Sequence, residues 1–181
     1  MLKIRKSLLV ALLVTLLAGH TASQKVAEAA GDAMGNSPVI LDKFAAEVIR
    51  PGDSWRVYLK AKDADGDMRT IVAQLWQAGV GIHHTDFTPV KEADTQEFAG
   101  YLFLRTPADN TLVWDRLKLT LFVRDRQGNR SESVELPLRF SLRAKQEIPE
   151  EWKTSANRKL SSIMIDLESS FKYNSGDEFR P

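Results

Sequence analysis

Apolar and polar side chains alternate along the chain between residues 38 and 141. In the run from Trp55 to Lys62, apolar residues occupy every second position on one face, and Arg or Lys side chains fall on the other. Further runs with this period cover residues 71–75, 98–104, 117–124 and 134–140, and residues 39–49 supply a first strand or a pair of short ones. A period of two is typical of half-buried β-strands, so the pattern predicts six or seven strands.

Turn-forming residues separate the strands. They lie at Pro51-Gly52-Asp53, 63–67, 107–110 and Gln127-Gly128-Asn129. Pro137 falls on the polar face of the last run, which is typical of an edge strand because proline has no N–H to donate. No helical period interrupts residues 38–141. We therefore expect an all-β fold in this part, an antiparallel sandwich of two sheets, with a closed barrel as the alternative.

Two motifs resemble the repeat modules of bacterial surface proteins. They are VYLKAKDADGD at residues 57–67 and LTLFVRDRQGNRS at residues 119–131, and the resemblance covers about residues 38–141. The modules are the bacterial immunoglobulin-like and cadherin-like domains. In them the first motif leads from the second strand into the third, and the second motif is the hairpin between the last two strands. The resemblance implies an immunoglobulin-like sandwich without the core cysteines of antibody domains, and says little about function.

The first 22 residues have the form of a secretory signal peptide. Lys3, Arg5 and Lys6 precede an uncharged, mostly apolar stretch at residues 8–18. As a helix this stretch would rise only about 16 Å, roughly half of a bilayer core, so a membrane anchor is not favoured. We expect cleavage between residues 22 and 30, a flexible linker over residues 23–37, and a periplasmic or secreted protein with no transmembrane segment.

Charge and cysteine content exclude several classes of function. The formal charge is +1, and removal of the signal peptide leaves 22 basic and 24 acidic residues without any basic run. This balance predicts no nucleic-acid partner and no anionic membrane surface. The chain has no cysteine, which excludes disulfides, thiolate nucleophiles, cysteine-ligated zinc and a lipid-modified cysteine.

An acidic turn is the first candidate site. Asp63, Asp65 and Asp67 alternate around Gly66, and carboxylates arranged in this way can converge on Ca²⁺, which takes six to eight oxygen ligands. The resemblance also implies calcium, because cadherin-like modules hold it at similar turns where consecutive domains meet. The alternative is a polar hairpin turn with no ion. No other cofactor is expected.

Other polar groups do not form a recognisable catalytic set. In an extended segment His84 and Asp86 lie on one side and His83 on the other, so a metal could recruit at most two of them. We favour exposed loop histidines. No Gly-x-Ser-x-Gly motif or phosphate-binding glycine loop occurs. The sequence therefore predicts that the protein is not an enzyme.

After residue 148 the apolar period changes to three and four. It includes Trp152, Ala156, Leu160, Ile163, Leu167 and Phe171. Pro149 suits a first helical turn, so the pattern predicts an amphipathic helix over residues 148–171, followed by a disordered tail at 172–181. Its apolar stripe either folds back on the sandwich or docks on a partner.

A binding role follows from these observations. The predicted partner-binding residues on the stripe are Trp152, Leu160, Ile163 and Leu167. The partner would be another envelope protein, or a second copy through the C-terminal helix. The sequence thus predicts an exported, non-catalytic binding or structural module of the cell envelope that acts through protein–protein contacts. The alternatives are a small envelope enzyme and a calcium-stabilised adhesion-type module.

Overall fold

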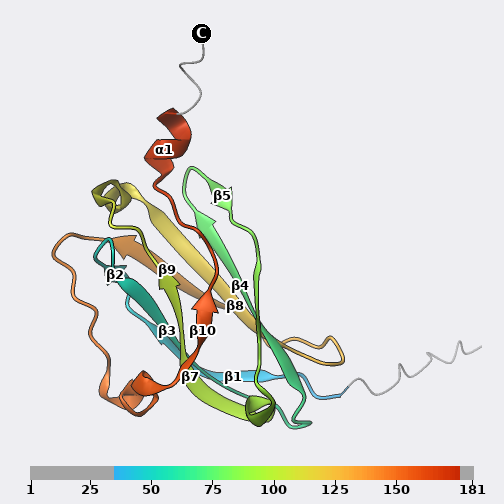
Figure 1. Cartoon of the computed structure of the whole chain (residues 1–181). Coiled ribbons are helices and arrows are strands. Elements are labelled where there is room, and N and C mark those ends of the chain that lie inside the picture. The colour runs from blue at the N-terminus through green and yellow to red at the C-terminus, as the bar shows by residue number, and fades with distance from the viewer. Residues whose placement is uncertain (1–34, 176–181) are drawn as a thin grey trace, which may run out of the picture. The chain divides into compact units, whose positions relative to one another are not determined.

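The computed structural model describes residues 35–175 as two β-sheets packed face to face (Figure 1). The predicted signal peptide, most of the predicted linker and residues 176–181 lie outside this range. Sheet A contains, in order, β1 (Val39–Ala45), β3 (Ser54–Lys62), β7 (Glu97–Arg105) and β10 (Lys159–Ile163). Sheet B contains β2 (Val48–Ile49), β9 (Val134–Phe140), β8 (Arg116–Asp125), β4 (Met68–Gln77) and β5 (Gly81–Ile82), and β6 (Asp86–Pro89) also pairs with β4.

Short helical turns connect or follow the strands. The 3-10 turns are η1 (Glu92–Asp94), η2 (Asn110–Trp114), η3 (Glu150–Trp152) and η4 (Thr154–Asn157). A single α-helix among the described residues, α1 (Ser170–Ser175), lies near the C-terminal end. The predicted all-β sandwich is therefore confirmed, with one small helix at its end.

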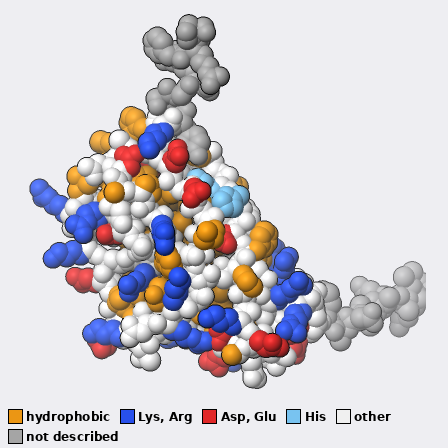
Figure 2. Space-filling model, in the orientation of Figure 1, with side chains coloured by type: hydrophobic (Ala, Val, Ile, Leu, Met, Phe, Trp, Pro, Cys, Tyr) orange, Lys and Arg blue, Asp and Glu red, His pale blue; other side chains and the backbone are white. Residues whose placement is uncertain are grey.

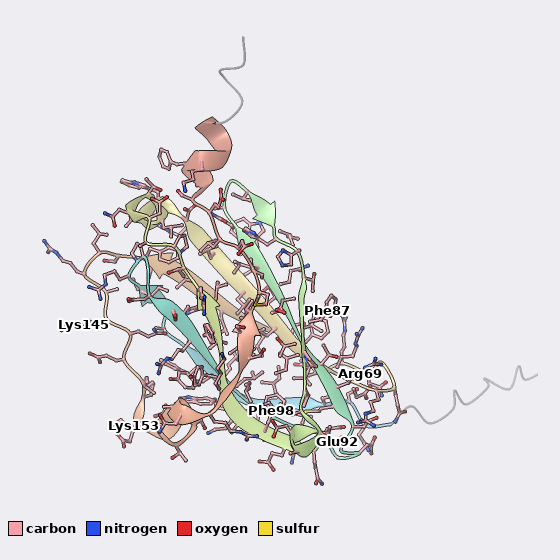
Figure 3. The ribbon with its side chains drawn as sticks, in the orientation of Figure 1. Arg69, Phe87, Glu92, Phe98, Lys145 and Lys153 are labelled. Carbon is pink, nitrogen blue, oxygen red and sulfur yellow. The ribbon has the colours of Figure 1, made fainter. Side chains whose placement is uncertain are left out.

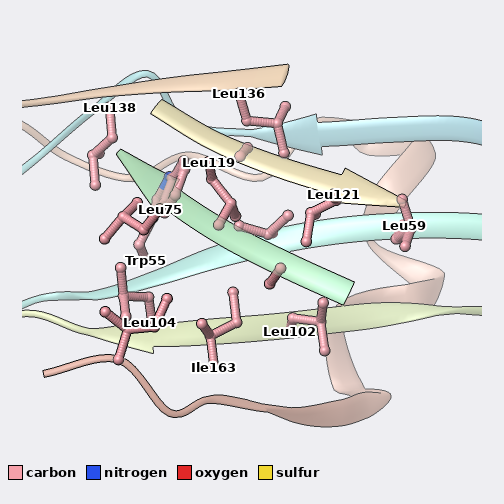
Figure 4. Close-up of a cluster of buried hydrophobic side chains, with 14 of the residues drawn as sticks. Trp55, Leu59, Leu75, Leu102, Leu104, Leu119, Leu121, Leu136, Leu138 and Ile163 are labelled. Atoms are coloured by element: carbon pink, nitrogen blue, oxygen red, sulfur yellow. The ribbon is translucent and has the colours of Figure 1, made fainter. Parts of the chain in front are cut away.

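The core lies between the two sheets and contains the apolar face of each predicted strand (Figure 4). Trp55 and Leu59 from β3 meet Leu102 and Leu104 from β7 and Leu119 from β8, all fully buried. Trp76 of β4 lies on the outer face of sheet B and is 43% exposed. The period of two therefore identified the buried face of the strands correctly.

The strand order is that of an immunoglobulin-like sandwich. The first strand is split between the sheets, because β1 pairs with β3 in sheet A and β2 pairs with β9 in sheet B. Two pairings are parallel, β2 with β9 and β10 with β7, so both sheets are mixed rather than purely antiparallel. Pro137 lies beyond the reach of β2, which pairs only with Arg139 and Phe140. At Pro137, β9 therefore borders no second neighbour, as expected of an edge strand.

The predicted amphipathic helix over residues 148–171 is wrong. That segment forms η3, η4 and β10, continues without regular secondary structure to residue 169, and becomes helical only at α1. In an immunoglobulin sandwich with strands A, B, E and D in one sheet, β10 occupies the place of strand D, beside β7. The free edge of β7 supplies backbone partners that an isolated helix would not use, and the gap between the sheets accepts the apolar side chains.

Residues 163–169 alternate between buried and exposed positions. Ile163, Ile165, Leu167 and Ser169 are buried, whereas Met164 is 70% exposed. Just before this segment, residues 158–160 lie close to β7 at Gly100, where a Cβ would lie 2.6 Å from the Arg158 carbonyl oxygen and 2.8 Å from Leu160 Cδ2. The C-terminal segment is therefore an extended strap that completes the core.

Candidate functional site

Polar side chains from the β4–β6 region hold the C-terminal strap in place. The backbone N–H of Met164 donates to Asp86 Oδ2 at 3.1 Å, and His84 Nε2 lies 2.6 Å from the Met164 carbonyl oxygen. A carbonyl only accepts hydrogen bonds, so His84 Nε2 carries the proton and donates. Figure 2 shows histidine side chains at the surface beside carboxylate and apolar side chains. The His84–Asp86 pair therefore binds the backbone N–H and C=O groups of Met164 in its own chain.

A second contact to the strap passes through Gln77, which is fully buried. Its Nε2 donates to the Glu168 carbonyl oxygen at 2.8 Å, and its Oε1 lies 2.8 Å from His83 Nε2. Burial and the neighbouring His84 lower the pKa of His83 below its usual 6.5. Both histidines were expected to be exposed loop residues. His84 is exposed and His83 is half-buried, and each forms a hydrogen bond to another residue.

The acidic turn between β3 and β4 brings two of the predicted calcium ligands together. Asp63 is 2% exposed, and its Oδ2 accepts the backbone N–H of Asp67 at 3.0 Å. Gly66 has a φ of 71°, a left-handed conformation that favours glycine and makes this turn possible. The buried Oδ1 atoms of Asp63 and Asp67 both lack a hydrogen-bond partner. Desolvation, the adjacent carboxyl of Asp63 and the charge of Asp125 raise the pKa of Asp67.

Asp65, the third predicted ligand, points to a different partner. Its Oδ2 accepts the Asn36 backbone N–H, and its Oδ1 accepts Asn36 Nδ2 at 2.9 Å. Sequence reasoning missed Asp125 instead, which lies at the end of β8 and is 2% exposed. Both oxygens of Asp125 accept from Asn129, each at 2.8 Å. Asp125 begins the turn after β8, which lies beside the turn between β3 and β4. The Arg126 backbone N–H in the turn after β8 donates to the Asp67 carbonyl oxygen.

The outer face of sheet B carries exposed apolar side chains. Trp76, Ile82 and Phe87 are 43%, 63% and 57% exposed. Trp76 pairs with Ile82 across β4 and β5, and Phe87 lies opposite Val72 of β4. A groove of about 560 Å³ runs beside Trp76 and Ile82 and is also lined by Gln74, Lys118, Thr120 and Glu135. In Figure 3, Phe87 lies at the outer edge of the sheet, and the buried Phe98 lies inside.

The four predicted partner-binding residues contact the chain's own sandwich. Ile163 and Leu167 belong to the core, and Leu160 packs against it half-buried. Trp152 covers the outer face of sheet A. The centre of its ring lies 5.5 Å from the centre of the Tyr58 ring and 4.5 Å from Lys60 Nζ. Trp152, Leu160, Ile163 and Leu167 therefore fold back on the sandwich, the first of the two alternatives, whereas Phe171 of the same stripe is 58% exposed.

Two further observations limit the candidate chemistry of residues 35–175. No group of three or more His, Cys, Asp or Glu side chains in this range is arranged to hold a metal ion. None of the helices in the range is long and apolar enough to cross a membrane.

The strand order defines an immunoglobulin-like β-sandwich. Comparison with known proteins does not assign the chain to a family. No protein-family model and no curated protein matches the chain. The sporulation control protein Spo0M of Bacillus subtilis is similar over 59% of this chain at 13% identity and a TM-score of 0.40, and the chain spans 50% of the Spo0M chain.

Two other solved structures are similar to parts of this chain at lower TM-scores. The CARDB domain of a Pyrococcus furiosus protein, solved with di-metal ions, matches 61% of this chain at 9% identity, with 97% of that domain covered and a TM-score of 0.33. The complex of zinc 2-glycoprotein (ZAG) and prolactin inducible protein from human seminal plasma contains a chain that matches 61% of this chain at 8% identity, with 99% of that chain covered and a TM-score of 0.34.

Proposed function

We propose that the protein is an exported, non-catalytic binding module that contacts another envelope protein through the outer face of sheet B. The observation that carries the proposal is the exposure of Trp76, Ile82 and Phe87 on one face. Leaving a large apolar side chain in water forgoes roughly 1.5–3 kcal/mol of burial free energy. Three such side chains near one groove therefore favour a surface that is covered by a partner.

The polar residues around this face support a role in protein binding. The groove's charged lining residues, Lys118 and Glu135, form an ion pair of 2.7 Å, so each neutralises the other. The Arg124 guanidinium lies 6.0 Å from the centre of the Phe87 ring. Aromatic residues and arginine are enriched in protein–protein interfaces.

Export is part of the proposal and rests on the sequence. The basic residues Lys3, Arg5 and Lys6 before an uncharged, mostly apolar stretch support a secretory signal. The complete absence of cysteine is compatible with a periplasmic or secreted location, since a sandwich with a full core needs no disulfide. We assign the contact surface to sheet B rather than to the C-terminal stripe, because Leu160, Ile163 and Leu167 of the stripe pack on their own sandwich.

Site-specific photocrosslinking in the native envelope tests the proposal. A benzophenone side chain replaces Ile82, and the matched control replaces Leu142, which is 54% exposed and apolar but lies outside sheet B. We expect one discrete adduct from position 82, absent from position 142 and lost when Trp76→Ser and Phe87→Ser are combined. Identical adducts from both positions, or none from position 82 in the folded protein, would contradict the proposal.

A further inference from the structure

Basic side chains from distant parts of the chain surround a pocket beside β3. The pocket has a volume of about 440 Å³ and is lined by Arg50, Asp53, Ser54, Arg56, Ala144, Lys145, Gln146 and Ile148. Its three cations and one carboxylate contrast with the groove on sheet B, where Lys118 and Glu135 neutralise each other. The sequence contains no basic run here, because the lining residues come from the turn before β3, from β3 itself and from the segment after β9.

Two of the three cations in the pocket have no acidic partner among residues 35–175. Arg50 is paired with Asp53, whose Oδ1 lies 3.8 Å from the Arg50 guanidinium and whose Oδ2 accepts the Arg50 backbone N–H at 3.3 Å. No salt bridge within this range reaches Arg56 or Lys145. The pocket therefore carries unmatched positive charge, which attracts an anion.

Gln146 fixes the wall of the pocket. Its Oε1 accepts the Arg56 backbone N–H at 2.8 Å, and its Nε2 donates to the Ser54 carbonyl oxygen at 2.9 Å. The side-chain amide thus takes the place of a neighbouring strand beyond the end of β1, where Ala45 pairs with Val57. The pocket is therefore preformed, as is typical of small-molecule sites, and a ligand does not have to order it.

Further cations lie next to the pocket on the outer face of sheet A. The Arg56 guanidinium carbon lies 5.2 Å from the centre of the Tyr101 ring. Arg105 and Lys159 lie 6.0 Å and 4.4 Å from the centre of the Phe103 ring, and no salt bridge within the described range reaches either cation. Figure 2 shows Lys and Arg side chains over β7 and β10. The positive charge therefore extends from the pocket across the sheet, as a ligand with several negative charges requires.

We propose that this pocket binds a sugar unit that carries a carboxylate, and that the cations on β7 and β10 bind further carboxylates of the same acidic polysaccharide. The planar guanidinium of Arg56 matches a carboxylate, and Lys145 supplies a second charge. The Ser54 hydroxyl and the Asp53 carboxylate can exchange hydrogen bonds with sugar hydroxyl groups. Asp53 also disfavours a doubly charged phosphate, because repulsion grows with the charge of the ligand.

An acidic peptide would present the same charges without the hydroxyl groups, so the two kinds of ligand can be distinguished. Isothermal titration calorimetry of the full mature chain with trigalacturonate tests the proposal. Maltotriose is the neutral sugar of the same length, and triglutamate with blocked ends carries the same number of carboxylates. We expect saturable binding of trigalacturonate alone, weaker in about 0.3 M than in about 0.05 M NaCl because salt screens exposed charges. No binding of trigalacturonate, or equal binding of maltotriose or triglutamate, would overturn the proposal.

Three variants test whether binding occurs in the pocket. Lys145→Gln removes an exposed charge outside regular secondary structure, so it should leave the urea midpoint unchanged and raise the Kd for trigalacturonate about tenfold, as expected for one hydrogen bond to a charged group. Arg56→Gln should raise the Kd by a similar factor. Lys62→Gln is the matched control, because Lys62 lies on the same face of β3 but six residues, or roughly 20 Å, from Arg56. An unchanged Kd in Lys145→Gln, or an equal loss of affinity in Lys62→Gln, refutes this site.

Discussion

The C-terminal strap should stabilise the fold through the residues that a strand buries, and Ile165 tests this most sharply. Ile165 is 4% exposed in the structure, although it lies off the apolar stripe of the helix that the sequence predicted. Phe171 has the opposite properties, since it lies on the helical stripe but is 58% exposed. Substituting each residue by alanine therefore distinguishes the two conformations.

The expected magnitude follows from burial. Truncating a buried isoleucine to alanine costs about 2–5 kcal/mol, depending on how far the site can collapse. Ile165 lies after the end of β10, where side chains rather than a strand partner hold the backbone. The strap can therefore shift, and we expect about 2–4 kcal/mol for Ile165→Ala. Met164→Ala, at a neighbouring position that is 70% exposed, should change stability by less than about 0.5 kcal/mol.

Urea unfolding followed by intrinsic fluorescence measures these differences. A fall in the midpoint with an unchanged slope would report a loss of free energy of unfolding. We expect the urea midpoint of Ile165→Ala to lie far below that of Phe171→Ala. The midpoint of Met164→Ala should lie close to that of the unmodified protein. A larger loss from Phe171→Ala than from Ile165→Ala would refute the extended strap and restore the helix.

Three more outcomes follow. Gly100→Ala should destabilise the fold by about 1–3 kcal/mol in the same assay, because its Cβ would meet the Arg158 carbonyl at 2.6 Å, and an undisturbed midpoint would mean that β10 is not seated on β7. The pKa of His83 is lowered in the folded protein, so below pH 6.5 the unfolded chain binds a proton at His83 more tightly than the folded protein does. The stability that neutral His83 contributes is therefore present above pH 6.5 and is lost as the pH falls below that value. The difference in free energy of unfolding between pH 7.5 and pH 5.5 should therefore be smaller in His83→Gln, and an equal difference would count against this role. Mass spectrometry of the protein from the envelope should give a mature N-terminus created by cleavage between residues 22 and 30, whereas an intact residue 1 would contradict export.

The strands could be predicted from the sequence because their signal is local. In β3 and β8 each side chain's position depends only on its parity along the strand, and the core residues Leu59 and Leu119 follow that rule. The C-terminal error has a different cause. Leu160, Ile163 and Leu167 satisfy a helical period, while Ile163, Ile165 and Leu167 satisfy a period of two. The choice between them depends on the free edge of β7, which is a property of the whole topology.

The candidate sites show the same division between local and long-range information. The turn at Asp63 and Asp67 could be found because its carboxylates lie close together in the sequence. Asp125 joins them only because β4 and β8 are neighbours, with Met68 opposite Asp125. The outward position of Trp76 is local information, because Ile71, Ala73 and Leu75 of β4 are buried and Trp76 lies on the opposite face of that strand.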